Sequence, residues 1–189
     1  MAFSLRKQII CTVVTVMLLA SHGAAFAQET SLANITVSNT RDDLLLYLTL
    51  EGAFSEKLKK EILSGVPAAF SFLAQLNSVR TMWLDRTVAD ITVTHVIKYD
   101  NLKKEFIVRR SWRNNEPEVT KSFAEAQKWM TEVNSLKIIP LGELEKGQQY
   151  QLRTKAEVRK QTLPYYLHYV LFFVSWDIET DWYTIDFIY

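Results

Sequence analysis

Residues 150–159 alternate strictly in polarity, and this stretch constrains the fold more than any other. One face carries apolar or small side chains and the other carries only polar or charged ones: Tyr150, Leu152, Thr154, Ala156 and Val158 against Gln151, Arg153, Lys155, Glu157 and Arg159. A sustained period of two is typical of a β-strand with one buried face. Such a strand belongs in an antiparallel sheet that packs on a core and faces water on its other side.

Other segments with strand character lie between turn signals. Residues 35–38 and 44–50 flank a polar turn cluster and predict a β-hairpin, and residues 91–99 are rich in β-branched side chains. Shorter or more continuous apolar runs occupy residues 68–76, 106–109 and 138–139, with turns at 100–101 and 114–117. Seven or more short strands at this spacing predict a mainly β fold (β-rich α+β), built as an antiparallel β-sandwich-like domain.

Two short amphipathic helices interrupt the strands and are expected in crossovers. Ser55 is a good N-cap for a helix that ends before Gly65 and Pro67. Ser122 and Glu125 form the sequence of a capping box, which predicts a second helix from there to about Val133.

Residues 1–27 have the order of a secretory signal peptide. Arg6 and Lys7 precede an apolar run over residues 9–20, and small residues end in Ala25-Phe26-Ala27 before Gln28. The run is shorter than the roughly 20 apolar residues of a membrane span, although an uncleaved N-terminal anchor is the alternative. We therefore expect a signal peptide at 1–27, one β-rich domain at 28–189, and a periplasmic or extracellular location.

The predicted mature chain, residues 28–189, contains no cysteine, because Cys11 lies within the predicted signal peptide. Its core must hold it without disulfides, and a domain of this size buries enough surface to do so. Acidic and basic residues nearly balance in it and form no charged run. A nucleic-acid partner would require a basic stripe, so none is expected.

Dispersed positions along the chain resemble a bacterial envelope family. They are Tyr99, Leu102, Phe106 and Val108, a helix over residues 123–130, then Leu144, Gly147, Tyr150 and Leu152, the Leu163-Pro164 pair, Ser175-Trp176, and Trp182. Over nearly the whole mature length the chain resembles the domain of unknown function 4390 family. The resemblance implies a secreted β-rich domain and implies no catalytic residues.

The predicted mature chain offers few residues for catalysis. His95 is expected to be a partnered sheet histidine, and Arg109, Arg110 and Arg113 to form surface ion pairs and the rim of a turn. A hydrolase would have to use His168 with Asp177 or Asp181. Asp177, Glu179 and Asp181 alternate, but the glycine and glutamate of a calcium loop are missing from the required places, so a solvated strand face is expected. We predict no catalytic residues, no metal and no cofactor.

Aromatic side chains are concentrated at the C-terminal end of the chain, in residues 163–189. They could close the core, form a contact surface for a protein, membrane or lipid, or, from the alternation at 183–189, resemble the last strand of an outer-membrane barrel. Uneven strand spacing and the two helices disfavour the last alternative. The candidate interaction patch is Tyr165, Tyr166, His168, Tyr169, Trp176, Trp182 and Tyr183. We expect a non-catalytic secreted domain that binds another envelope protein, and a lipid- or small-ligand-binding protein is the alternative.

Overall fold

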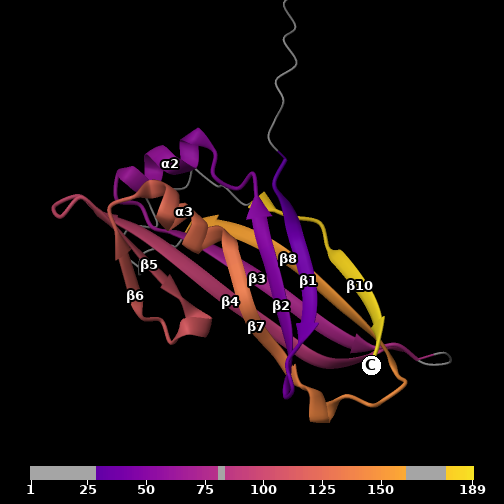
Figure 1. The fold of residues 1–189 in the computed structure, drawn as a ribbon. Helices are drawn as coiled ribbons and strands as arrows, with labels where there is room; N and C mark the ends of the chain where they lie inside the picture. Colours follow the sequence, from indigo (N-terminus) through magenta and orange to yellow (C-terminus); the bar gives the residue numbers. More distant parts are fainter. Residues whose placement is uncertain (1–28, 81–83, 161–177) are drawn as a thin grey trace, which may run out of the picture.

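The computed structural model describes residues 29–80, 84–160 and 178–189, which form two antiparallel β-sheets packed face to face (Figure 1). The smaller sheet has the order β1-β2-β7, with β1 at Ser31–Asn39, β2 at Asp43–Glu51 and β7 at Glu132–Pro140. The predicted hairpin of β1 and β2 is confirmed, and β7 joins it from much later in the sequence.

The larger sheet contains the remaining described strands and has the order β10-β8-β3-β4-β5-β6. Their bounds are Ala68–Ser78 for β3, Arg86–Asp100 for β4, Glu105–Arg110 for β5, Pro117–Thr120 for β6, Gln149–Lys160 for β8 and Tyr183–Ile188 for β10. A short strand, β9 at Ile178–Glu179, also pairs with β8. All of these pairings are antiparallel, and the predicted β-rich sandwich-like fold is confirmed.

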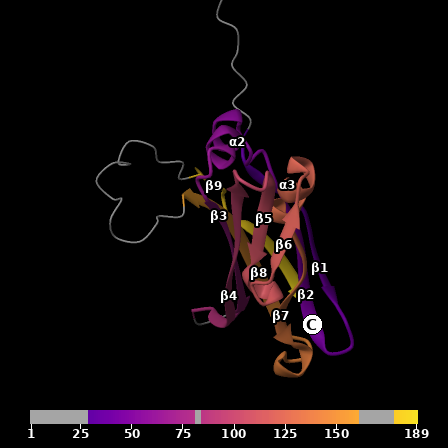
Figure 2. The ribbon, with the colours of Figure 1, turned by 90° about the vertical axis from the view of Figure 1, so that its left-hand side faces the viewer.

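Both helices cross from one sheet to the other at the same end of the sandwich (Figure 2). Helix α2 (Glu56–Leu63) leads from β2 to β3, and helix α3 (Phe123–Thr131) leads from β6 to β7. The rings of Phe54 and Phe123 meet edge to face there, with centroids 5.7 Å apart. Among the described residues, none of the helices has the length and apolar character needed to cross a membrane. Short 3₁₀ turns, η1 (Ser111–Arg113) and η2 (Leu141–Glu143), follow β5 and β7.

Both predicted N-caps are present, but the second helix has only half of a capping box. The Ser55 hydroxyl accepts from the Leu58 N–H at 3.2 Å, and the Ser122 hydroxyl accepts from the Glu125 N–H at 3.3 Å. The Ser122 N–H donates instead to the Thr120 hydroxyl at 3.0 Å. The Glu125 carboxylate accepts a hydrogen bond from that same hydroxyl, so Thr120 stands between the two partners of the expected box.

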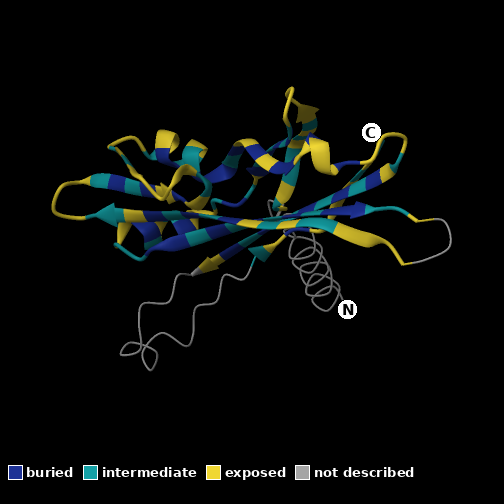
Figure 3. Cartoon of the chain, turned by 90° about the horizontal axis from the view of Figure 1, so that it is seen from below, coloured by how far each residue is buried: buried dark blue, intermediate teal, exposed yellow. Residues whose placement is uncertain are grey.

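Buried and exposed positions alternate along most strands, as Figure 3 shows. On β8 the apolar face predicted from residues 150–158 is buried throughout. Phe72 of β3, 1 % exposed, lies between Val93 of β4 and Ala156 of β8 in the register of the sheet. Side chains of both sheets and both helices form one core, so burial of this shared face holds the layers together.

Several strand boundaries differ from prediction, and the differences fall at edges and irregular pairings. β7 spans residues 132–140 rather than 138–139, because two register shifts against β2 remove the alternation that would have revealed it. β4 begins at Arg86 rather than at residue 91, and β1 begins at Ser31, ahead of the predicted start at residue 35. β6 begins at Pro117, the last residue of the predicted turn at 114–117.

Candidate functional site

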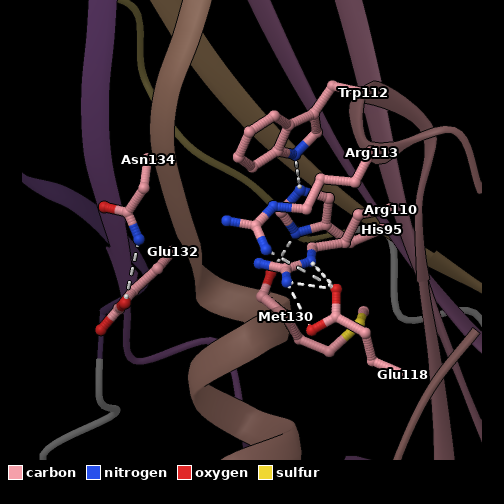
Figure 4. A network of polar contacts seen from close by, with 8 residues as sticks. All are labelled: His95, Arg110, Trp112, Arg113, Glu118, Met130, Glu132 and Asn134. Carbon is pink, nitrogen blue, oxygen red and sulfur yellow. Dashed lines mark hydrogen bonds and ion pairs between the residues drawn. The ribbon is translucent and has the colours of Figure 1, made fainter. Parts of the chain in front are cut away.

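A polar network lies inside the sandwich around His95, at the middle of β4 (Figure 4). The imidazole is 0 % exposed and both ring nitrogens have partners. Nδ1 lies 3.0 Å from the carbonyl oxygen of Met130, and Nε2 lies 2.9 Å from the indole Nε1 of Trp112. A carbonyl can only accept and an indole N–H can only donate, so the neutral tautomer carries its proton on Nδ1.

The pKa of His95 is lowered from 6.5 to about 4, mainly by burial and also by the nearby Arg110 guanidinium. The hydrogen bond to Met130 and the Glu118 carboxylate act in the opposite direction without reversing the shift. His95 is therefore neutral at neutral pH, with its one donor and its one acceptor both in use. This confirms the prediction of a partnered sheet histidine.

Arg110, at the end of β5, is buried rather than at the surface, which corrects the sequence-based expectation. Its side chain is 5 % exposed and forms an ion pair with Glu118 of β6, in which Nη2 lies 2.6 Å from Oε2. Arg113 covers the Trp112 ring from 5.0 Å and reaches Glu118 at 4.0 Å. Arg110 needs this carboxylate beside it because an unpaired buried charge is costly. Beside this network, Asn134 donates to Glu132 at 3.2 Å.

No local pattern in the sequence indicates this network directly. The signal that could have found it is the spacing: Arg110 and Glu118 flank the turn at 114–115, so a hairpin there places them on neighbouring strands. Val108 pairs with Glu118, and Arg110 follows on the same inward face. The arrangement joins β4, β5, β6 and the end of α3, and is suited to fixing a corner of the fold.

The predicted interaction patch is described only at its C-terminal end. Trp182 and Tyr183 are 38 % and 48 % exposed, respectively, at the start of β10. Tyr165, Tyr166, His168, Tyr169 and Trp176 lie outside the described residues, as does Asp177. The structure therefore places only Trp182 and Tyr183 of the predicted patch, and it places both at the surface.

Trp182 lies against two cationic side chains of β8. The Arg153 guanidinium and the Lys155 ammonium lie 4.9 Å and 5.1 Å from its ring centroid. Lys155 also contacts Glu179 and lies 3.0 Å from Glu157. The hydrogen bond to Glu179 and, to a smaller extent, the hydrogen bond to Glu157 raise the pKa of Lys155. These contacts hold the indole over the outer face of the larger sheet while part of the ring stays exposed.

The chain leaves the sheet at Thr180, between β9 and β10. The Thr180 hydroxyl there accepts a hydrogen bond that a backbone carbonyl would accept in a regular strand pair. The Thr180 N–H donates to the Ala156 carbonyl at 2.9 Å, and the Ala156 N–H donates to the Thr180 hydroxyl at 3.0 Å. Asp181 lies outside both strands, so it does not share a strand face with Glu179. The alternation of residues 177, 179 and 181 had predicted a shared face, and this prediction is wrong for Asp181. Within the described ranges, no group of three or more potential ligands is placed to hold a metal ion.

A pocket of about 380 Å³ lies where β1 begins opposite β9 and β10. Its apolar lining includes Leu32, Ile178 and Tyr183, and its acidic lining includes Glu29 and Asp181. Because residues of both sheets line it, the pocket is an opening between the two layers on this side of the sandwich. Its volume falls at the lower end of the range for small-molecule sites.

A family model described as a domain of unknown function (DUF4390) matches residues 27–186, which is most of the chain. No curated protein and no solved structure matches the chain significantly.

Proposed function

The chain belongs to the domain of unknown function 4390 family, whose description names no activity, and we propose that it is a non-catalytic secreted domain that binds another envelope protein. The contact surface is β10 with the residues that lead into it. The observation that carries the proposal is the set of large side chains exposed there, Trp182, Tyr183 and Ile188, of which Ile188 is 74 % exposed. Aromatic residues at a surface are the usual anchors of protein interfaces.

The surface at β10 is held in place before any partner arrives. Arg153 and Lys155 fix the indole of Trp182, and the backbone of Tyr183–Ile188 is paired to β8 along its whole length. A surface that is already ordered loses less conformational entropy on binding. The polar network around His95 is a poorer candidate, because both nitrogens of its histidine are engaged inside the protein.

The proposed compartment is the periplasm or the cell exterior, after removal of residues 1–27. The charged start, the short apolar run and the Ala25-Phe26-Ala27 site support it, and the family match begins at residue 27. Mass spectrometry of the protein from fractionated cells tests this. A mature chain that begins at Gln28 in the soluble envelope fraction is expected, whereas an intact chain retained in membranes would favour an N-terminal anchor.

Photo-cross-linking in intact cells tests the binding function. A photo-reactive residue replaces Tyr183, and the matched control replaces Leu102, which is 95 % exposed at the turn between β4 and β5. We expect a discrete protein adduct from position 183 and none from position 102. Equal adduct patterns at the two positions, or no adduct at position 183, would contradict a binding surface at β10.

The pocket between the two layers favours a second candidate, a lipid- or small-ligand-binding protein. Leu32, Ile178 and Tyr183 could contact an apolar group while Glu29 and Asp181 face a polar one. Lipid adducts from position 183 in the same cross-linking experiment would support this candidate over the first. The hydrolase alternative stays a prediction, because His168 and Asp177 lie outside the described residues.

A further inference from the structure

β10 is the one described edge strand that combines regular pairing with exposed large side chains. β1 carries a bulge between Ala33 and Thr36, β7 carries two register shifts, and β6 is short and begins with Pro117. Bulges, prolines and short length are features that protect sheet edges from pairing with other chains. β10 pairs with β8 without a register shift from Tyr183 to Ile188, and no described strand occupies its other edge.

The backbone groups on that free edge follow from the register. The Tyr189 N–H donates to the Gln148 carbonyl at 3.2 Å, so Tyr189 directs its backbone toward β8. Backbone direction alternates along a strand, so Tyr183, Ile185 and Phe187 also face β8. Thr184, Asp186 and Ile188 therefore direct their N–H and C=O groups toward the free edge. Each of them offers one donor and one acceptor to an added strand.

The charge at this edge is mostly acidic. Asp186 is exposed in the middle of β10, where Gln151 of β8 donates to it at 3.0 Å. Asp181 and Glu29 are exposed at the pocket near the start of β10. On the neighbouring β8, Lys155 is engaged by Glu157 and Glu179, and both Arg153 and Lys155 lie over Trp182. Asp186 is the charge that an added strand would meet first.

A second copy of the chain fits this edge poorly. An antiparallel pairing about a two-fold axis that uses Thr184, Asp186 and Ile188 places Asp186 directly opposite the same residue of the other copy. Like charges in directly opposed positions destabilise a sheet. A strand that carries a positive charge at this position has the opposite effect.

We infer that the partner presents an extended basic segment that adds to the free edge of β10. This deepens the proposed function and rests on it. The segment alternates Lys or Arg with apolar residues: one basic side chain lies opposite Asp186 on the outer face, and the apolar ones lie beside Tyr183 and Phe187 on the inner face. Backbone pairing supplies the register, and the alternation supplies the specificity.

The test uses the full mature chain and two short capped peptides, one alternating Lys with Val and one alternating Glu with Val. Binding is followed by NMR through hydrogen exchange of the amides of Thr184, Asp186 and Ile188. We expect the Lys–Val peptide to slow their exchange and the Glu–Val peptide to leave it unchanged. Asp186→Lys should weaken the first peptide by about five-fold or more and bind the second more tightly than the unmodified protein does.

Thr184→Pro removes one outward N–H without removing a hydrogen bond to β8, and Thr184→Val is its matched control. Proline should abolish binding and valine should preserve it, with the amide signals of β4 reporting that both variants are folded. Equal binding of the two peptides to the unmodified chain would overturn the basic segment while leaving strand addition intact.

Unchanged binding to a folded Thr184→Pro variant would overturn strand addition, and self-association through β10 would overturn the choice of partner. The cross-linking result at position 183 does not depend on the peptides or on the variants at Thr184 and Asp186. It therefore tests the proposed function separately.

Discussion

Acidification should destabilise this protein through one histidine. Because the pKa of His95 is lowered to about 4 in the folded chain, the folded state stays neutral at this position while the unfolded state takes up a proton near pH 6.5. A histidine with a lowered folded-state pKa contributes its stabilisation above the unfolded-state value. That contribution is lost as the pH falls from 6.5 to about 4.

The size of the effect follows from the two pKa values. At about pH 7.5 neither state is appreciably protonated, so the contribution of His95 is intact. At about pH 5 the unfolded chain is almost fully protonated and the folded chain is mostly neutral, which lowers the free energy of unfolding by about 2 kcal/mol. Below about pH 4 the loss should level off at about 3 kcal/mol.

The structural reason is that imidazolium cannot replace imidazole in this network. A proton on Nε2 would face the Trp112 N–H 2.9 Å away, so two donors would oppose each other. The added charge would also lie near buried Arg110, whose positive charge already disfavours protonation. His95 therefore either stays neutral, or the contact between His95 of β4 and Trp112 of η1 must break when the imidazole is protonated.

Urea unfolding at about pH 7.5 and about pH 5 measures the effect, with His95→Gln as the comparison. Glutamine keeps a donor and an acceptor but does not titrate in this range, so the variant should lose about 2 kcal/mol less than the unmodified chain between the two conditions. Carboxylates that titrate in this range are common to both proteins and cancel in the difference. Equal losses in the two proteins would refute the assignment of a buried neutral His95.

Three further substitutions, one with a matched control variant, test the packing and polar contacts by denaturant unfolding at neutral pH. Glu118→Ala leaves the Arg110 guanidinium buried without its carboxylate and should cost about 3 kcal/mol. Lys137→Ala breaks the pair between exposed Lys137 and half-buried Asp43 and should cost less than about 1 kcal/mol, whereas similar losses in the two variants would show that Arg110 is hydrated. Phe72→Ala should cost about 3–5 kcal/mol because it empties the centre of the core, and a loss below about 1 kcal/mol would contradict its burial. Gly52→Ala should destabilise the chain by at least about 1 kcal/mol and expose residues 29–31 to proteolysis. The reason is that Gly52 has φ +73° and that a Cβ would lie 2.5 Å from the Glu29 carbonyl oxygen. An unchanged unfolding midpoint and an unchanged cleavage pattern would contradict that contact.

Strands with unbroken alternation and helices with a clear N-cap residue are predictable from the sequence. Alternation over residues 150–159 predicts β8 almost to the residue, and Ser55 and Ser122 mark the starts of both helices. Sheet order is not predictable in this way, because nothing local indicates that β8 lies between β3 and β10. Most of β7 also escapes prediction, since Ser135, with φ +62°, lies within an irregular pairing that breaks the period of two.

The candidate site is predictable only in part, for the same reason. Exposed aromatic residues at Trp182 and Tyr183 can be proposed from composition, but their position at a free edge depends on the pairing of β10 with β8. Burial of Arg110 depends on Glu118, which only the β5–β6 hairpin brings beside it. A prediction from sequence places charged residues at the surface, because they are rarely buried unless they are paired. A buried ion pair is therefore missed until the partner strand is known.

Both sheets are completed by strands that come late in the sequence, β7 in the smaller sheet and β8 to β10 in the larger. The hairpin of β1 and β2 is complete by residue 51, but its third strand ends at residue 140, and β3 gains its second neighbour only when β8 has emerged. A two-stranded hairpin alone is marginally stable in water. During synthesis, the apolar faces of the earlier strands therefore stay uncovered until strands from the last third of the chain have been made. Such long-range pairing folds slowly, and the unpaired strands are exposed to aggregation until the last of them has joined the sheets.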